Sequence, residues 1–448
     1  MCYGPAVSGS FRRRLLALAL AGLAVRLLFV LLEPKTSPVA DETVWTRWGM
    51  EVLRAPDVRF SPFRHRLIFH PPLYPYFVGL VGTLFGSLGA VKLAQCLVGA
   101  ALVPALGFAG SRAFGERAGL VAAGLGAFYP ELVWFCAHFW AETLFLALLW
   151  WGLERLLAAD SGLSAGAAVA SGVLLGLAVL TRETVLYFLP FAAFWLGWRR
   201  RGGWRRAALL FAAALLVVAP WTLRNWVVFR AFVPVSTAGA LNLFQGNARL
   251  TRPEVYEQYW AVRGPIERYR FARQAGLEAV RERQPLWILE KLRDQVPNFW
   301  EADSQALVHV VRGAYGEVRP AVAIAAWVVM LLPYFLVLAL SVAGIAALPL
   351  TRASVLLVGF LLFYVLLHVA THGYARYRLP VVPVLFLVGG HAWAAWRRHP
   401  RPVLTPARRA TAAVVAIVLA LSLFPSLRWW FTDPWMDRAG RTEAEGEP

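Results

Sequence analysis

The chain has 448 residues, of which 59% are hydrophobic and only 16% are charged, and its mean hydropathy is +0.55. A water-soluble domain of this size cannot bury so much apolar surface, so the composition excludes a soluble enzyme. The apolar residues form blocks long enough to cross a bilayer and do not alternate with polar ones, which excludes a transmembrane β-barrel. The sequence therefore predicts an all-α multi-span membrane protein.

The basic charge of the chain is the second general feature. Lysine and arginine number 45 against 26 acidic residues, giving a net charge of +19. Such an excess can indicate nucleic-acid binding. Here, however, the arginines cluster between apolar blocks, where the positive-inside rule places them on the cytoplasmic side. We interpret the charge as a topology signal and expect no nucleic-acid partner.

Apolar segments along the chain are candidates for membrane helices. They lie at 14–32, 73–86, 88–111, 118–130, 139–157, 163–181, 184–198, 207–223, 321–349, 353–370, 379–396 and 410–427. The first follows Arg12–Arg14 and has no clear cleavage site, so we interpret it as a retained span rather than a signal peptide.

The side of the membrane on which each loop lies limits how many of these candidates can cross it. Residues 33–72 follow the first span and lie outside, whereas the Arg-rich run at 199–206 marks the cytoplasmic side, so an odd number of spans separates them. Six candidates lie between them. Segment 73–86 is the weakest, because it is short, follows Pro71-Pro72 and contains Tyr74-Pro75-Tyr76, which suits an interfacial or re-entrant helix. We therefore expect about 11 transmembrane helices, within a range of 11–13.

The predicted organisation is one membrane domain with an inserted outer loop, without internal repeats. Its parts are a cytoplasmic N-terminus at 1–13, an N-terminal membrane module at 14–223 that includes a first outer loop at 33–87, a large outer loop at 224–320, C-terminal membrane helices at 321–427 and a polar tail at 428–448.

Acidic residues near the predicted outer face are candidates for catalysis. Asp41 and Glu42 follow the first span, and adjacent carboxylates there can bind a metal ion or take a proton from an attacking hydroxyl. A helix cap is the structural alternative for this pair. Glu142 leads directly into an apolar span, where a carboxylate is costly unless it has a purpose. Glu131 follows Pro130 and either starts a helix or contacts substrate.

Arginines on the predicted outer side depart from the positive-inside pattern and are candidates for binding phosphate. The basic and amide candidates are Arg182, Arg224, Asn225, Arg376 and Arg378. Arg376 and Arg378 lie among tyrosines at 373–380, which suits a lipid-linked phosphate, with ordinary anionic headgroups as the alternative. Arg182 precedes Glu183, with which it could instead form an ion pair.

The histidines show no metal-binding motif. His70 precedes two prolines and either orients a substrate or is a solvated loop residue. His368 and His372 have the i, i+4 spacing of metal ligands, but no nearby acidic residue completes such a site, and His309 is alone. The chain also lacks a Walker A motif and a G-x-S-x-G motif, so ATP-driven transport and serine hydrolysis are unsupported.

Several short motifs occur in an order that is more specific than any one of them. They are Asp41-Glu42, HPPLY at 70–74, YPE at 129–131, AETLF at 141–145, GLAVLTR at 176–182, PWTLRN at 220–225, STAGALNLFQGN at 236–247 and ARYRLPVVP at 375–383. Together they resemble the GT-C fold integral-membrane glycosyltransferases, in the branch of the dolichyl-phosphate-mannose-protein mannosyltransferases and aminoarabinose transferases. The resemblance spans residues 14–398.

The resemblance implies transfer of a sugar from a polyprenyl-phosphate-linked donor, within membrane lipids, at the outer face. Asp41, with Glu42 beside it, would be the general base or a ligand of the metal or acceptor, and Glu142 the second carboxylate. Arg376 and Arg378 would hold the donor phosphate. The residues expected to bind substrate are His70, Glu131, Arg182, Arg224, Asn225, Asn242, Asn247, Arg376 and Arg378. Some relatives of the aminoarabinose transferase type have a lysine before the two prolines, where this chain has His70. The resemblance therefore leaves the role of His70 open.

The acidic residues and arginines predicted at the outer face suit the transfer of a sugar from a phosphate-linked donor. Inverting displacement at an anomeric carbon needs a base for the acceptor hydroxyl and stabilisation of the departing phosphate, which leaves without protonation. The acceptor is a lipid, a glycan or a protein, and a divalent metal, Mg²⁺ or Mn²⁺ bound by Asp41 and Glu42, is an open cofactor. The arginine-rich, lysine-poor composition suggests a bacterial cytoplasmic membrane as the setting.

Two other classes remain as alternatives. A transporter or flippase of lipid-linked sugars would place charges near the bilayer midplane and show repeat symmetry, whereas this chain places them at the outer rim. A non-catalytic assembly scaffold would not depend on the carboxylates, so substitution of Asp41, Glu42 and Glu142 separates it from an enzyme.

Overall fold

The computed structural model describes residues 7–33, 41–54, 68–162, 164–311, 313–316, 318–397 and 405–432. These ranges fold into helices and contain no β-strand. The elements in chain order are α1 (Gly9–Leu32), α2 (Asp41–Arg54), α3 (Leu73–Leu84), α4 (Leu88–Phe114), α5 (Glu116–Phe128), α6 (Pro130–Ala137), α7 (Glu142–Ser161), α8 (Ala165–Thr181), η2 (Glu183–Tyr187), α9 (Leu189–Gly197), α10 (Gly203–Phe229), α11 (Ala238–Asn247), α12 (Arg252–Ala261), α13 (Pro265–Glu282), α14 (Trp287–Trp300), α15 (Gln305–Val311), α16 (Pro320–Ala347), α17 (Arg352–Ala370), η3 (Ala375–Arg378), α18 (Val382–Trp396) and α19 (Pro406–Thr432).

Long apolar helices confirm the predicted all-α multi-span membrane fold. Within the described ranges, α1, α4, α10, α16, α17 and the apolar part of α19 are each long and apolar enough to cross a membrane. Helices α5 and α6 meet at a 45° bend and together form one further candidate. Helices α3, α8 and α18 and the η2–α9 segment are apolar but shorter. The total of about 11 crossings therefore stays a prediction.

Small residues allow the membrane helices to pack closely. At Gly172 of α8, an added methyl group would lie 2.2 Å from the carbonyl oxygen of Leu210 in α10. At Gly176, one turn later, it would lie 2.8 Å from the carbonyl oxygen of Ala214. Backbones that approach so closely are typical of helix pairs in membranes. Helix α7 packs against α8 on one side and against α4 on another.

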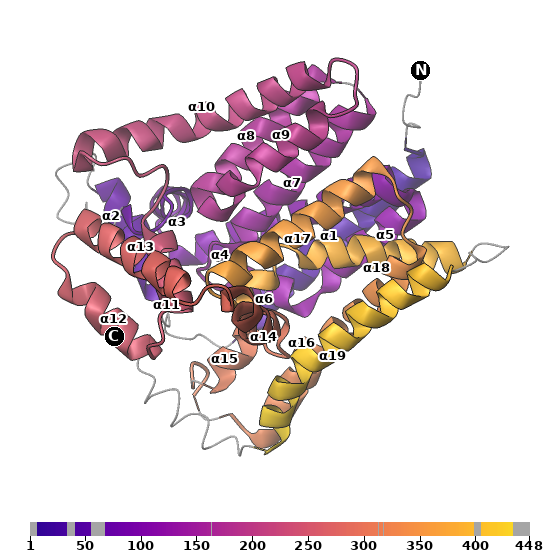
Figure 1. Cartoon of the computed structure of the whole chain (residues 1–448). Coiled ribbons are helices and arrows are strands. Elements are labelled where there is room, and N and C mark those ends of the chain that lie inside the picture. The colour runs from indigo at the N-terminus through magenta and orange to yellow at the C-terminus, as the bar shows by residue number, and fades with distance from the viewer. Residues whose placement is uncertain are drawn as a thin grey trace.

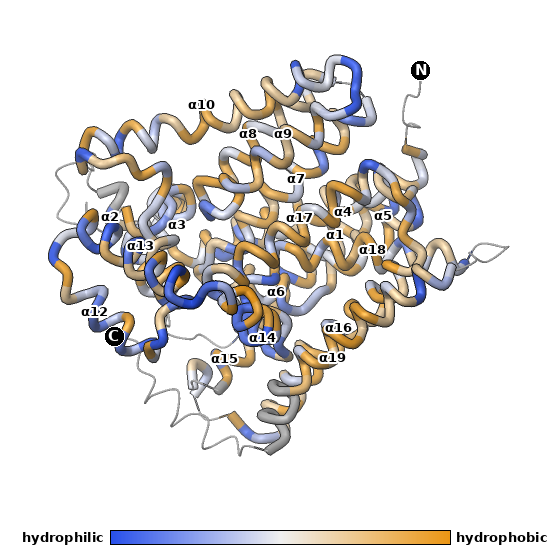
Figure 2. Tube along the Cα trace, in the orientation of Figure 1, coloured by the Kyte–Doolittle hydropathy of each residue, from blue (hydrophilic) through white to orange (hydrophobic). Residues whose placement is uncertain are grey.

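The segment between α10 and α16 is helical, and its first helices form a small core of their own. Figure 1 shows α11, α12 and α13 together with α2 near the C-terminal end of α10. Side chains of α11, α12 and α13 pack together in this core, which includes Leu241, Phe244, Val255, Tyr259 and Ala272. Figure 2 shows that these helices carry more hydrophilic residues than the long helices. This hydrophilic character suits the outer loop predicted at 224–320.

Helix α7 joins two buried polar regions. It begins at Glu142 and ends at Ser161, so Glu142 and Asp160 lie about 27 Å apart along the helix axis at 1.5 Å per residue. Near its C-terminal end, the Asp160 carboxylate accepts hydrogen bonds from Arg200 at 3.0 and 3.1 Å and from Arg352 at 3.0 Å. Glu154, also buried, accepts hydrogen bonds from arginines with both oxygens.

Candidate active site

Glu42, in the first turn of α2, is the predicted carboxylate at the centre of the site. Its side chain is only 3% exposed. Oε1 accepts a hydrogen bond from the backbone N–H of Phe139 at 2.8 Å, and Oε2 lies 3.7 Å from Nε2 of His309. The α6–α7 connection and α15 therefore meet at this carboxylate. Asp41 is the first residue of α2, and its side chain lies outside the described part of the structure.

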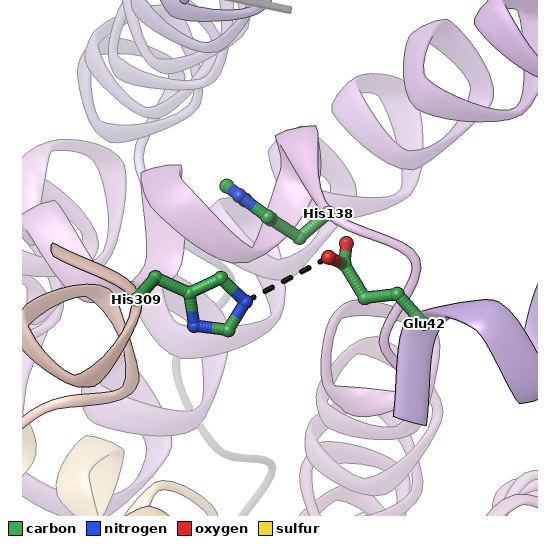
Figure 3. A group of neighbouring side chains, drawn as sticks. All are labelled: Glu42, His138 and His309. Carbon is green, nitrogen blue, oxygen red and sulfur yellow. Dashed lines mark ion pairs between the residues drawn. The ribbon is translucent and has the colours of Figure 1, made fainter. Parts of the chain in front are cut away.

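Two buried histidines complete a cluster with Glu42 (Figure 3). Nδ1 of His138 lies 3.1 Å from the carbonyl oxygen of Trp134, and Nδ1 of His309 lies 2.9 Å from that of Gln305. A carbonyl oxygen can only accept, so each Nδ1 carries a hydrogen, and Nε2 is the ring nitrogen of each histidine that can bind a metal ion. Burial lowers the pKa of His138 to about 4, which makes this imidazole neutral at pH 7.

This cluster fits a divalent metal ion. One ligand atom from each of Glu42, His138 and His309 lies within 4.8 Å of the others. Bonds of about 2.0–2.2 Å to a single ion place ligand atoms roughly 3–4 Å apart, and the Glu42–His309 separation lies in that range. Nε2 of His309 is buried and has no hydrogen-bond partner among the described residues. A metal ligand atom without a protein partner is the expected state of such a site before the ion binds.

A further group of residues surrounds His138. Nε2 of His138 lies 3.2 Å from Oε1 of Glu33, the residue that follows α1. The Tyr315 hydroxyl donates to the same oxygen at 3.0 Å and lies 3.3 Å from Nε2 of His138. Burial raises the pKa of Glu33 to about 7, against the opposing effect of Lys92. The Glu33 and Tyr315 side chains thus border the cluster on the side of His138.

Gln95 of α4 fixes the connection that carries His138. Its side-chain amide donates to the carbonyl oxygens of Cys136 at 3.0 Å and of His138 at 2.8 Å. The hydroxyl of Tyr74, in α3, donates in turn to Oε1 of Gln95 at 2.8 Å. All three groups are buried, so these bonds hold the backbone between α6 and α7 in one conformation.

Glu142 forms the second acidic part of the site, together with two predicted arginines. It is 3% exposed at the start of α7, and Nη2 of Arg182 donates to its Oε1. Nε of Arg376 lies 3.7 Å from the same oxygen. The Arg376 guanidinium stacks on the ring of Trp140 at 4.3 Å. The structure therefore brings together Glu142, Arg182 and Arg376, which are 234 positions apart in sequence at most.

Trp140 lies between the Glu42 cluster and the Glu142 ion pairs. Its ring centroid lies 6.3 Å from that of His309 and 4.3 Å from the Arg376 guanidinium, and it also packs against Phe135. The preceding residue, Phe139, donates its backbone N–H to Glu42. The four-residue connection at 138–141 thus contacts both the Glu42 cluster and the Glu142 ion pairs, and we treat them as one site.

Arg378 and Glu131 bind the chain that leads to α15. Arg378 is 1% exposed, and its guanidinium donates to the carbonyl oxygens of Glu301, at 2.8 Å, and Asp303. It also stacks on Tyr334 at 4.2 Å. Glu131 accepts a hydrogen bond from the backbone N–H of Gln305. These side chains contact the segment just before His309, so the structure gives Arg378 surroundings different from those of Arg376.

The remaining predicted residues lie in other contacts. His70 packs against the rings of Trp45 and Trp48, with centroid distances of 4.6 and 5.1 Å. Arg224 stacks on Trp221 and donates to Asn225, whose amide donates to the carbonyl oxygens of Val233 and Val235.

The other two predicted asparagines, Asn242 and Asn247, lie on α11. Asn247 is buried and bonds to the carbonyl oxygens of Leu243 and Ala370, whereas Asn242 is partly buried. The side-chain amide nitrogens of Asn225 and Asn247 thus donate to the backbone carbonyl oxygens of Val233, Val235, Leu243 and Ala370, whereas Glu142 pairs with arginines.

A sequence comparison finds that part of this chain is similar to a known family. Residues 69–223 match the family model described as dolichyl-phosphate-mannose-protein mannosyltransferase. The match begins just before α3 and ends within α10, so it includes His138, Glu142 and Arg182. No curated protein matches the chain.

Solved structures extend the likeness over the whole chain. The apo crystal structure of the Archaeoglobus fulgidus oligosaccharyltransferase aligns with a TM-score of 0.54 at 14% identity, covering 98% of this chain and 56% of that one. The structure of this archaeal enzyme with an inhibitory peptide and a dolichol-phosphate has a TM-score of 0.53 at 15% identity and the same coverage. Its complex with Zn and sulfate has a TM-score of 0.52 at 16% identity, covering 91% and 52%.

These comparisons confirm the predicted resemblance to the GT-C fold. The chain spans 56% of the length of the archaeal protein, so the likeness concerns this part of it. At 14–16% identity the alignment establishes a shared fold, and the chemistry has to be argued from the residues of this chain.

Proposed function

We propose that this chain is a membrane-embedded glycosyltransferase. It transfers a sugar from a polyprenyl-phosphate-linked donor to a lipid, glycan or protein acceptor at the outer face of a bacterial cytoplasmic membrane. The GT-C fold and the match at residues 69–223 to a family described by a dolichyl-phosphate-mannose substrate support this class. The dolichol-phosphate bound in the archaeal complex further supports the donor class.

The observation that carries the proposal is a group of buried polar atoms without partners at one place. Nε2 of His309, Nε1 of Trp140, Oε2 of Glu142 and Nε of Arg182 are all buried and have no hydrogen-bond partner among the described residues. Buried polar atoms are normally satisfied, because leaving one unpaired costs roughly 1–3 kcal/mol. Both donors and acceptors are left unpaired here, which suits a hydroxylated and phosphorylated substrate.

The proposed reaction is a displacement at the anomeric carbon of the donor sugar. The acceptor hydroxyl oxygen attacks the anomeric carbon of the donor sugar while the bond from that carbon to the phosphate oxygen breaks. The hydroxyl proton passes to a carboxylate of the Asp41-Glu42 pair. The polyprenyl phosphate leaves as an anion, so the reaction needs one base and no second carboxylic acid.

Arg182 and Arg376 are placed to stabilise the departing phosphate. Both guanidinium groups face the single carboxylate of Glu142, and this carboxylate fixes their positions. Trp140 supports Arg376 from its ring face. Preorganised cations of this kind lower the barrier most when charge develops on the leaving group. We assign Arg378 to positioning, through the backbone at 301–303, and the phosphate contact to the other two arginines.

A divalent metal ion fits the Glu42 cluster. When bound, it would act as a Lewis acid that lowers the charge on the donor phosphate. Glu42, His138 and His309 would hold it, with the Nδ1–H bonds to Trp134 and Gln305 orienting the two imidazoles. Two imidazole nitrogens and one carboxylate favour Zn²⁺ over Mg²⁺.

The test of the function is a donor panel. Purified enzyme is incubated with different polyprenyl-phosphate sugars and a membrane lipid extract as acceptor, and the release of polyprenyl phosphate is measured. We expect release with at least one donor and none with nucleotide sugars. Consumption of nucleotide sugars with no release from any polyprenyl-phosphate donor would overturn the proposal. Metal content of wild type and His309→Gln, measured by mass spectrometry, tests the metal site independently of activity.

A further inference from the structure

A cavity of about 560 Å³ lies among α11, α14 and the link that follows α17. This volume is within the roughly 300–1,000 Å³ of small-molecule sites. We call it the outer pocket. Unlike most such sites, it is lined chiefly by polar side chains, including the amides of Gln245 and Gln295. A polar lining suits a ligand with many hydroxyl groups.

The outer pocket carries an excess of positive charge. Its cationic side chains are Arg249, Arg252, Arg283, Lys291 and Arg293. It also contains two carboxylates, each of which already has an arginine partner. Glu290 lies 3.5 Å from Arg249, and Asp294 accepts a hydrogen bond from Arg293 at 2.6 Å. Five cations and two anions leave three positive charges, so the pocket attracts anions.

The floor of the outer pocket is held rigidly. Lys291 is 2% exposed, and its Nζ donates to the carbonyl oxygens of Gly246 and Thr371. A methyl group at Gly246 would lie 1.4 Å from the Thr371 oxygen, so α11 directly abuts the link after α17. The charged groups therefore stand on a preorganised surface, which reduces the entropy lost on binding.

The same link leads to the active site. His372 lines the outer pocket, and Arg376, four residues later, faces Glu142. Four residues span at most about 14 Å of chain. The ring of Tyr377 lies between them, 6.3 Å from the His372 ring and 5.6 Å from the Arg376 guanidinium. The outer pocket therefore lies close to the reacting centre, on the same short stretch of backbone.

We propose that the outer pocket binds an acidic sugar of the acceptor, one that bears a phosphate or a carboxylate. This inference rests on the proposed glycosyltransferase function and names the substrate class. The donor phosphate must lie at the reacting carbon, beside Arg182 and Arg376, so a second anionic site belongs to the other substrate. The amides beside the cations provide contacts to the sugar hydroxyls.

Binding tests the proposal without requiring turnover. Full-length protein in detergent is titrated with glucose 6-phosphate, glucuronate, glucose and inorganic phosphate, in wild type and in Arg249→Gln/Arg293→Gln. Both arginines expose 76% of their side chains, so their removal leaves the fold intact. The matched control is Arg270→Gln/Arg281→Gln, which removes the same charge from exposed positions of α13 outside the pocket.

We expect at least one acidic sugar to bind more tightly than glucose, and its affinity to fall about tenfold or more in the pocket variant only. The acid that binds, phosphate or carboxylate, identifies the group that is recognised. Equal binding of glucose, equal binding of inorganic phosphate and glucose 6-phosphate, or an equal loss in both double variants would overturn the proposal.

Kinetics separate this proposal from the function on which it rests. In Arg249→Gln/Arg293→Gln, the KM for an acidic acceptor should rise about tenfold, while release of polyprenyl phosphate to water without acceptor stays at the wild-type rate. Unchanged acceptor KM would overturn the acceptor site alone. Absence of polyprenyl phosphate release in the wild type with acceptor present would instead contradict the glycosyltransferase function, while the binding result would still stand by itself.

Discussion

The two ends of α7 carry buried carboxylates in opposite situations. Near the C-terminal end, Asp160 and Glu154 use both of their oxygens to accept hydrogen bonds from arginines. At the N-terminal end, Glu142 pairs through Oε1, while its Oε2 has no hydrogen-bond partner among the described residues. At the C-terminal end both oxygens of each carboxylate are hydrogen-bonded, whereas at the N-terminal end Glu142 keeps one oxygen available. The difference distinguishes a structural ion network from a site prepared for a substrate.

The residues around Glu142 and Glu42 add to this difference between the two ends of α7. Around Glu142 and Glu42, atoms of His309, Trp140 and Arg182 are also buried without partners in the part of the chain that the structure describes. Buried atoms in this state lower the stability of the free protein, a cost that a functional site can carry because its ligand later satisfies them. We therefore expect substitutions at the N-terminal end of α7 to change catalysis, and substitutions at the C-terminal end to change stability.

The largest effect is expected for Glu42→Gln. The amide keeps the size of the side chain but cannot accept a proton or bind a metal as an anion, so kcat should fall roughly 10²–10⁴-fold. The rate of polyprenyl phosphate release measures this, with the unfolding temperature as the control for folding. If the variant kept more than half of the wild-type rate, Glu42 would have no part in the mechanism.

Arg376→Gln should reduce kcat by roughly 10²–10³-fold, because it removes a cation from the departing phosphate. Its matched control is Arg378→Gln, two residues away, where the loss acts through the backbone of residues 301–303. We expect the control to lower the unfolding temperature as well as the rate. If both variants lost activity without any loss of stability, the distinct roles of the two arginines would be contradicted.

Tyr315→Phe should have a smaller effect, about 10–100-fold on metal affinity, since the hydroxyl contacts Glu33 and His138 rather than the ion itself. The bound metal per protein, determined after dialysis against graded zinc buffers, provides the readout. Wild-type zinc affinity in this variant would show that the hydroxyl does not orient His138 for the ion.

The smallest catalytic effect is expected for Asp160→Asn. Replacement leaves Arg200 and Arg352 without their anion and should cost roughly 1–3 kcal/mol, less than a fully buried pair because both arginines are partly exposed. Thermal unfolding in detergent should show this, with kcat unchanged in the folded protein. A large fall in kcat without destabilisation would break the contrast between the ends of α7.

The sequence allowed prediction of much of the fold, because apolar segments and arginine clusters are local features. The multi-span helical architecture follows from them, and the likeness to GT-C structures confirms it. Segments such as α3 and α18, however, are shorter than a full crossing. Hydropathy alone cannot decide whether helices of this length cross the bilayer, since neighbours and tilt determine that.

The site was predictable where rare charges mark it. Glu142, Arg182 and Arg376 stand out in sequence as polar groups at the ends of apolar segments, and the structure brings them together. Arg378 could not be separated from Arg376 by sequence. Both lie in the 3₁₀-helix η3, where residues two apart project about 120° from each other, so one guanidinium reaches Glu142 and the other turns to the backbone.

The sequence did not predict the pairing of His138 with His309, and the reason is different. His138 and His309 are 171 positions apart, and their approach depends on how α15 packs against α6. Motifs with fixed spacing detect ligands on one helix and cannot detect this arrangement. The signal in the sequence was that His138 is the single polar side chain in the apolar run at 132–141. Glu33 was not predicted either, because in the sequence it is only the residue that follows the first apolar segment.

The most direct test of the proposed catalytic centre compares Glu42→Gln and Asp160→Asn with wild type in one assay. Each protein, at equal folded concentration, receives the polyprenyl-phosphate sugar that the wild type accepts, and the released polyprenyl phosphate is measured. We predict that Glu42→Gln loses at least about 100-fold in rate, whereas Asp160→Asn keeps the wild-type rate. Equal rates for the two variants would contradict the assignment of Glu42 and its histidines as the catalytic centre.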